Sequence, residues 1–328
     1  MGDKFTSTKT NKFRSSIEFL LVVLWNTTKL HTYYINIKIE KKQTAIPELP
    51  LRIQKKYSMI LLYKKIKKEG IVLKILAVGD IIGATGIREL KNKLYQIRQK
   101  EEIDFVIVNG ENSAEGMGIT EKNFNDIISQ NVDVVTMGNH TWGKKDIFKF
   151  IDHPKLIRPA NYPKGVVGKG YGIYECKNKK IAVINLIGRV YINVLSENPF
   201  LVVKEIIKKI KDKVDIIIVD FHAEATGEKI TMGYYLDGMV TAVFGTHTHV
   251  QTADEKILPK GTAYISDIGM TGTKNSALGM DVSVALKRFE TSLPERYKVA
   301  SGEGMLNGVI YDIDDKTNKV KTITRINI

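Results

Sequence analysis

Two histidines, His247 and His249, stand two residues apart in the segment Gly245-Thr246-His247-Thr248-His249 and could bind one metal ion. Imidazole is the commonest protein ligand for transition metals. An apolar run, Val240 to Phe244, precedes the pair and predicts a buried strand. A His-x-His pair is a weak signal by itself, because such pairs also occur on exposed strands. Its meaning depends on which other polar residues follow strands.

Further polar residues follow predicted strands in the same way. They are Asp80, Glu111, Asn112, Asn139, His140 and His222. In open α/β sheets, ligands bind beyond the carboxyl ends of the strands, so we expect all these side chains at one edge. Four of the five histidines after residue 72 lie at such positions, and only His153 does not. Chance does not readily produce this distribution, which therefore predicts a metal site.

The types of these side chains indicate the class of metal. Carboxylate, carboxamide and imidazole groups without thiolate suit Mn, Fe, Zn or Co rather than Cu(I). The candidate ligands are Asp80, Glu111, Asn112, Asn139, His222, His247 and His249. This set is too large for one four-coordinate ion and suits two ions that share a carboxylate. Two ions about 4 Å apart activate a water and neutralise phosphoryl oxygens, so the expected chemistry is phosphate-ester hydrolysis.

Strands and helices that must position these residues alternate along the chain. Strands are predicted at 73–78, 105–108, 132–137, 181–186, 214–219, 240–244 and 262–268. Helices are predicted at 84–100, 120–130, 144–151 and 200–213. This order predicts an α/β fold with a largely parallel central sheet flanked by helices. Residues 307–314 and 319–328 alternate in polarity around a turn and predict a C-terminal β-hairpin.

The positive charge of the chain is concentrated at its start. Residues 1–72 carry 15 Lys/Arg and 5 Asp/Glu, whereas residues 73–328 carry 35 and 31. The first segment has no sustained hydrophobic period, and its apolar run Ile17 to Trp25 is too short to span a bilayer. We expect residues 1–72 to be a disordered extension or no part of the native protein, whose true start lies near Val72 or Leu73. An RNA-binding or membrane-binding basic arm is the alternative.

Residues 73–328 are expected to form one domain. A single cysteine, Cys176, excludes an internal disulfide framework and a cysteine-based zinc site. It also fits a reducing compartment, so we expect a cytoplasmic protein without membrane association.

The motifs together resemble those of the calcineurin-like metallophosphoesterases, with two departures. The first motif of that superfamily usually reads Asp-x-His, but Ile81-Ile82-Gly83 follows Asp80 here. The second motif usually bridges two metals through Asp, where this chain has Glu111 followed by Asn112. Both departures are typical of one branch, the YmdB-like bacterial phosphodiesterases. That branch also resembles this chain at residues 108–112, 137–142, 158–161, 220–225 and 245–254.

The resemblance covers essentially residues 73–328 and implies a cytoplasmic 2′,3′-cyclic-nucleotide phosphodiesterase. It also implies two divalent or trivalent metal ions, usually iron or manganese, with Zn, Co or Mg as alternatives. Carried over residue by residue, it surrounds one ion with Asp80, Glu111, Asn112 and His249. The other ion is surrounded by Glu111, Asn139, His222 and His247, with Glu111 as the bridge. Asn112 would replace the missing histidine of the first motif.

His140 is not a member of this ligand set. We expect it to face the substrate and to protonate the leaving ribose oxygen, while a hydroxide activated by the two ions attacks phosphorus in line. The alternative is that His140 only positions the phosphate. Thr141 is expected to donate a hydrogen bond to phosphate, or else to cap a helix before Lys144.

Two other functions are compatible with these residues. A metal core does not by itself choose a substrate, so a broader phosphomonoesterase or a nuclease is one alternative. A regulatory protein that binds a nucleotide or RNA around a mainly structural metal site is the other, although such a site has no need of His140. The expected partner is a cyclic nucleotide or another phosphate ester. RNA contact and a homo-oligomer are left open.

Overall fold

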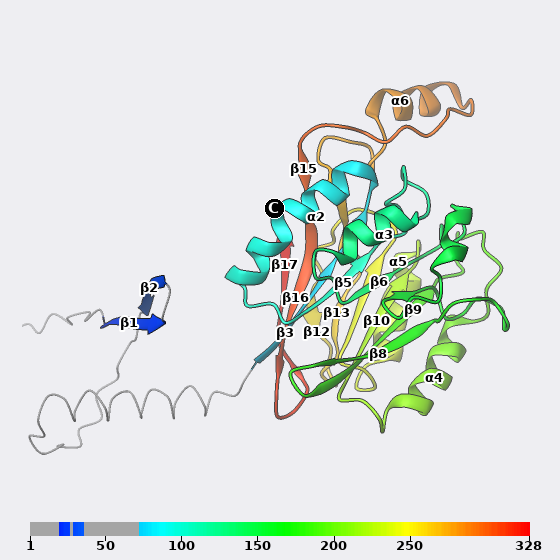
Figure 1. Cartoon of the computed structure of the whole chain (residues 1–328). Helices are drawn as coiled ribbons and strands as arrows, with labels where there is room; N and C mark the ends of the chain where they lie inside the picture. Colours follow the sequence, from blue (N-terminus) through cyan, green and yellow to red (C-terminus); the bar gives the residue numbers. More distant parts are fainter. Residues whose placement is uncertain (1–19, 27–28, 36–71) are drawn as a thin grey trace, which may run out of the picture. The chain divides into compact units, whose positions relative to one another are not determined.

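The computed structural model describes residues 20–26, 29–35 and 72–328 (Figure 1). The chain divides into two units, Met1–Lys64 and Lys65–Ile328. In the first unit, β1 (Leu20–Asn26) and β2 (Lys29–Ile35) pair as antiparallel strands, although the sequence shows no regular period there. This pair does not test whether residues 1–72 belong to the native protein, and that stays a prediction.

The second unit contains two six-stranded sheets. The first has the order β17-β16-β3-β5-β6-β7. Its strands are β3 (Val72–Val78), β5 (Phe105–Asn109), β6 (Val134–Thr136), β7 (Leu156–Ile157), β16 (Asn307–Asp314) and β17 (Val320–Asn327). Strands β3, β5, β6 and β7 are parallel, and β16 and β17 form the predicted antiparallel C-terminal hairpin on one side of them.

The second sheet has the order β12-β13-β11-β10-β9-β8. Its strands are β8 (Tyr171–Cys176), β9 (Lys179–Ile187), β10 (Ile216–His222), β11 (Ala242–Thr246), β12 (Lys256–Ile257) and β13 (Ala263–Ile265). The four inner strands are parallel, and the two edge strands run antiparallel to them. A small third sheet joins β4 (Asp80–Ile81), β14 (Met270–Thr273) and β15 (Gly304–Met305).

Helices cover the outer face of each large sheet (Figure 1). The first sheet is covered by α2 (Gly83–Lys100), α3 (Glu121–Ile128) and the 3₁₀ helix η1 (Lys145–Lys149). The second sheet is covered by α4 (Pro199–Ile210) and α5 (Thr226–Tyr235). A last helix, α6 (Val282–Thr291), lies on a long connection at the top of the view. No helix within the described ranges is both long and apolar enough to cross a bilayer.

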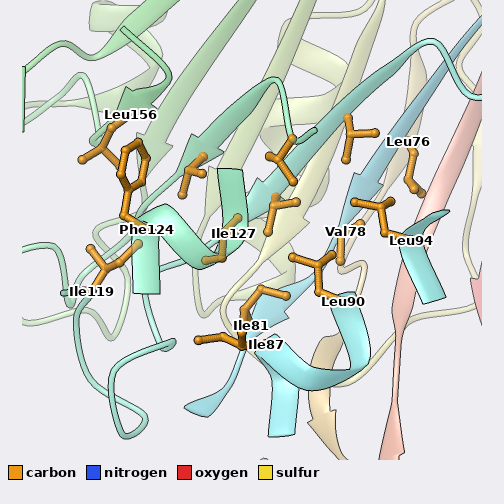
Figure 2. Close-up of a cluster of buried hydrophobic side chains, with 14 of the residues drawn as sticks. Leu76, Val78, Ile81, Ile87, Leu90, Leu94, Ile119, Phe124, Ile127 and Leu156 are labelled. Carbon is orange, nitrogen blue, oxygen red and sulfur yellow. The ribbon is translucent and has the colours of Figure 1, made fainter. Parts of the chain in front are cut away.

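Side-chain alternation along the strands separates three apolar cores. Leu76 and Val78 of β3 pack with α2 and α3 in the cluster of Figure 2. Ile75 and Ala77 of the same strand point the other way, into a core shared between the two sheets. The third core lies between the second sheet and its helices. Because each central strand is buried on both faces, its sequence is a near-continuous apolar run.

The predicted fold class is confirmed, because largely parallel sheets flanked by helices make up residues 72–328. The parallel strands are divided between two facing sheets instead of forming a single one. The sequence prediction also left out β8, α5 and α6. Of these, α5 and α6 have few buried residues, so neither shows a strong apolar stripe in sequence.

Candidate metal centre

The predicted ligands gather where parallel strands of both sheets end. Asp80 follows β3, Glu111 and Asn112 follow β5, Asn139 follows β6, His222 ends β10, and His247 and His249 follow β11. The two sheets therefore contribute to one site from opposite sides. The Oε1 atom of Glu111, from the first sheet, lies 3.0 Å from Nε2 of His222, from the second.

His222 lies at the centre of one half of the site. Its Nε2 lies 2.9 Å from Oδ1 of Asn139 and 3.0 Å from Nδ1 of His247. One ligand atom each from Glu111, His222 and His247 can be chosen so that all lie within 4.8 Å of one another. These distances suit a cation held among them.

The other half of the site contains His249, Asn112 and Asp80. Nε2 of His249 lies 3.1 Å from Nδ2 of Asn112 and 3.9 Å from Oδ1 of Asp80. The backbone N–H of His247 donates to Oδ2 of Asp80 over 3.3 Å. Glu111 joins the halves, because Nδ2 of Asn112 also donates to its Oε1 over 3.3 Å.

The chemistry of these residues fits a metal ion. Asp80 is fully buried, and its Oδ1 has no hydrogen-bond partner among the described residues. An unpaired buried carboxylate oxygen is expensive unless a cation or donor satisfies it. Carboxylate, amide and imidazole groups converge with no thiolate, as a harder transition metal prefers. The site therefore offers Asp80 Oδ1 to an ion rather than to another protein group.

The His-x-His loop has an unusual backbone. His247 and His249 have φ values of 103° and 65°, in the left-handed region that residues with a side chain rarely adopt. Gly245 lies so close to the carbonyl oxygen of Ser266 that no Cβ fits there. Backbone strain like that of His247 and His249 persists only where surrounding contacts hold the chain in place, and it is concentrated at functional sites.

Gly138 has no space for a side chain, because a Cβ there would overlap Oε2 of Glu111 and the ring of His222. We predict that Gly138→Ala separates these two groups and lowers turnover by about 100-fold, as misplacement by about 1 Å can do. Gly227→Ala is the matched control, because its Cβ would meet nothing within 4 Å in α5. Equal phosphodiesterase rates for the two variants would contradict the prediction.

Mutual proximity shifts the pKa values of the buried groups. Burial alone would lower the pKa of His222, but the carboxylates of Glu111 and Asp80 outweigh it and raise the pKa to about 9. Burial would raise the pKa of Glu111, but His222 and His140 hold it well below its usual range. Burial, together with the charge of His222, lowers the pKa of His247 to about 3. In the metal-free chain near neutral pH, His222 is therefore protonated and His247 is neutral.

Metal binding should consequently release a proton. A metal ligand must be a neutral imidazole, so an ion bound near neutral pH displaces about one proton from His222. The release should vanish as the pH rises past about 9, where His222 is already neutral. Titration of Mn²⁺ into metal-free protein, by calorimetry in buffers of different ionisation enthalpy, measures the proton count. A count that does not change with pH would contradict the pKa assigned to His222.

Two predicted residues differ from expectation in detail. Asn112 turns Oδ1 toward Nδ1 of His140, at 2.8 Å, and Nδ2 toward His249, so its amide must rotate to offer oxygen to an ion near His249. Thr141 is fully buried and donates to the carbonyl oxygen of Gly138 over 2.6 Å. The helix-cap alternative for Thr141 is wrong, because η1 begins after Lys144 without a side-chain cap. A hydrogen bond from Thr141 to phosphate would require the hydroxyl to leave Gly138.

Sequence reasoning gave no role to several neighbours of the site. Oε2 of Glu224 lies 3.0 Å from Nε2 of His247. Asp267 accepts hydrogen bonds from both the backbone N–H and the hydroxyl of Thr248, and pairs with the buried Lys229 at 2.7 Å. These contacts fix the loop that carries His247 and His249. Only Glu224 had a sequence signal, since it lies two residues after His222 at a strand end.

Known proteins share this fold and much of this sequence. A Bacillus subtilis 2′,3′-cyclic-nucleotide 2′-phosphodiesterase is 50% identical over 255 residues, which span 77% of this chain and 96% of that protein. The crystal structure of a phosphatase from Mycoplasma pneumoniae is 38% identical, with a TM-score of 0.75 over 79% of this chain and 94% of its own. The crystal structure of a hypothetical protein from Thermus thermophilus is 34% identical, with a TM-score of 0.74 over 78% and 99%.

The sequence profile of the YmdB-like proteins matches residues 76–326, nearly the whole of the second unit. The resemblance seen in the sequence motifs is thereby confirmed. This chain belongs to the YmdB-like protein family.

Proposed function

We propose that this protein is a metal-dependent phosphodiesterase and that its substrate is a 2′,3′-cyclic nucleotide. The observation that carries the proposal is that Glu111 contacts both His222 and Asn112, with the backbone N–H of His140 beside them. The name of the Bacillus subtilis relative supports this substrate class. An acidic and imidazole-rich cluster next to a partly exposed histidine suits hydrolysis of a phosphate ester.

We also propose a two-ion centre, with Fe or Mn as the metals. The two halves of the site support this number, because each brings a histidine and an amide to the shared Glu111. The first ion would lie among Asp80, Glu111, Asn112 and His249. The second would lie among Glu111, Asn139, His222 and His247. When bound, the ions would neutralise phosphoryl oxygens and lower the pKa of the attacking water.

In this proposal, His140 acts on the leaving group. As the P–O bond to the ribose oxygen breaks, that oxygen needs a proton, and His140 is placed to give it. The His140 backbone N–H donates to Oε2 of Glu111 over 2.9 Å, which holds this residue against the ligand cluster. Its side chain is 32% exposed, so a substrate can reach the ring.

A substrate panel tests the proposal. Purified protein with Mn²⁺ is assayed against 2′,3′-cyclic AMP, 3′,5′-cyclic AMP and a phenyl phosphate monoester, with and without a chelator. We expect 2′,3′-cyclic AMP to be hydrolysed fastest and all activity to disappear with chelator. Faster hydrolysis of the monoester would favour a phosphomonoesterase instead. Activity that survives complete removal of metal would contradict the proposal.

A cytoplasmic location is part of the proposal, and the free thiol of Cys176 supports it because such a thiol fits a reducing compartment. Cell fractionation with an antibody against the chain tests this directly. RNA contact and a homo-oligomer stay predictions from sequence.

A further inference from the structure

A carboxyl group, Asp220, is buried in the layer between the two sheets, two residues before His222 on β10. Residues two apart on a strand share a face. Ile216 and Ile218, farther back on that face, belong to the apolar core between the sheets. Asp220 therefore occupies a place where an apolar side chain would pack, and burying a carboxyl group there is costly unless its hydrogen bonds have a use.

Asp220 accepts a short hydrogen bond from Thr246, at the end of the adjacent strand β11. The Thr246 hydroxyl donates to Oδ1 of Asp220 over 2.7 Å, and Nδ2 of Asn109 lies 3.4 Å from Oδ2. The same hydroxyl lies 2.9 Å from Nδ1 of His222. Both Asp220 and Thr246 are fully buried, and Thr246 stands directly opposite His222 in the parallel register of β10 and β11.

The single proton of the Thr246 hydroxyl determines the tautomer of His222. A threonine hydroxyl has one proton to donate. Because Thr246 gives this proton to Asp220, it can only accept a hydrogen bond from His222, whose proton must then sit on Nδ1. In the neutral ring that a metal ion requires, the lone pair of Nε2 then faces Glu111, Asn139 and His247, where the ion would lie.

We propose that Asp220 and Thr246 are positioning residues that fix the tautomer and ring orientation of His222 for metal binding. Neither residue is a ligand and neither reaches the substrate. Partners of this kind make a ligating histidine more basic, and their loss costs about 10–100-fold in metal affinity. The inference rests on the proposed metal centre and adds to it the groups that prepare one ligand.

Valine replaces threonine with almost the same shape but no hydroxyl, so Thr246→Val is the main test. The measurement is the dissociation constant for Mn²⁺, by calorimetry on chelator-treated protein. We expect binding about 10–100-fold weaker in Thr246→Val, with recovery in Thr246→Ser, which restores the hydroxyl. Asp220→Asn should weaken binding less, because an amide oxygen still accepts from Thr246. Thermal unfolding of each metal-free variant checks that it folds.

Thr271→Val is the matched control. Thr271 is also fully buried on a strand, but its hydroxyl has no hydrogen-bond partner in the described part of the chain, so we expect unchanged Mn²⁺ affinity. Should Thr246→Val bind Mn²⁺ as tightly as the natural chain, Thr246 has only a structural role and the inference is wrong. If Thr246→Val does not fold, Asp220→Leu decides, because leucine has a similar shape but no acceptor for the Thr246 hydroxyl, and unchanged affinity there overturns the inference. A natural chain that binds no Mn²⁺ would contradict the proposed function as well.

Discussion

Replacing Glu111 with glutamine should remove both of the proposed metal ions and reduce phosphodiesterase activity to background. Glu111 is the residue that connects the two halves of the site, through His222 at 3.0 Å and Asn112 at 3.3 Å. Glutamine has nearly the same shape but no charge, and a neutral amide cannot offset two cations. Loss of a residue that only orients a ligand already costs about 10–100-fold in metal affinity, so loss of a shared ligand should cost more.

Metal content measured by mass spectrometry on protein purified without added metal tests this prediction. We expect two ions per natural chain and fewer than one per chain in Glu111→Gln. Glu89→Gln is the matched control, because Glu89 is a buried carboxylate on α2 that pairs with Lys93 at 3.0 Å and Arg88 at 3.1 Å. If Glu111→Gln retained one ion with full occupancy, Glu111 would belong to a single ion and would not be a bridge.

The position of the site could be predicted because strand ends are visible in sequence. Val72–Val78 and Phe105–Asn109 are apolar runs that stop at glycine or a polar residue. In parallel sheets such ends meet at one edge, so Asp80 and Glu111 could be expected together without knowledge of the strand order. The structure brings them into the same cluster as His222 and His247.

The division into two sheets could not be predicted from the same runs. Ile75 faces the other sheet and Leu76 faces the helices, yet both positions demand only an apolar side chain. A strand buried against helices on both faces would have the same composition as one buried against a helix layer and a second sheet. Whether the strands form one sheet or two depends on pairing between strands that are far apart in the sequence, such as β3 with β16. No local sequence pattern indicates which strands pair.

Residues that support the ligands were also invisible in sequence. Asp267 reaches Thr248 across 19 positions and Lys229 across 38. A single aspartate or lysine has no periodic pattern in the sequence. Its supporting role can be recognised only when the structure shows that it is buried and has an ionic partner. The same holds for Asp220, which the sequence presents as one polar residue at the end of an apolar strand.

Replacing His140 with alanine should lower turnover by about 10²–10⁴-fold, the usual contribution of general acid catalysis. Metal content should change little, because the backbone N–H of His140, which alanine keeps, makes the closer contact with Glu111, at 2.9 Å, whereas ring Nδ1 lies 3.5 Å from Oε1. Nδ1 of His140 lies 2.8 Å from Oδ1 of Asn112, so a protonated ring donates there. Nε2 makes no hydrogen bond to any other described residue, and in the protonated ring it carries the proton that a leaving ribose oxygen needs.

Two measurements separate acid catalysis from simple positioning of phosphate. A substrate with a good leaving group, such as a nitrophenyl phosphodiester, needs no proton, so an acid role predicts that His140→Ala slows it far less than a cyclic nucleotide. Positioning predicts equal losses on both substrates and a raised KM. His153→Ala is the matched control, because His153 packs edge-on against Phe124 in the core, with 4.8 Å between ring centroids. Since the acid acts only on the bond that breaks, equal losses on both substrates would leave His140 with a binding role alone.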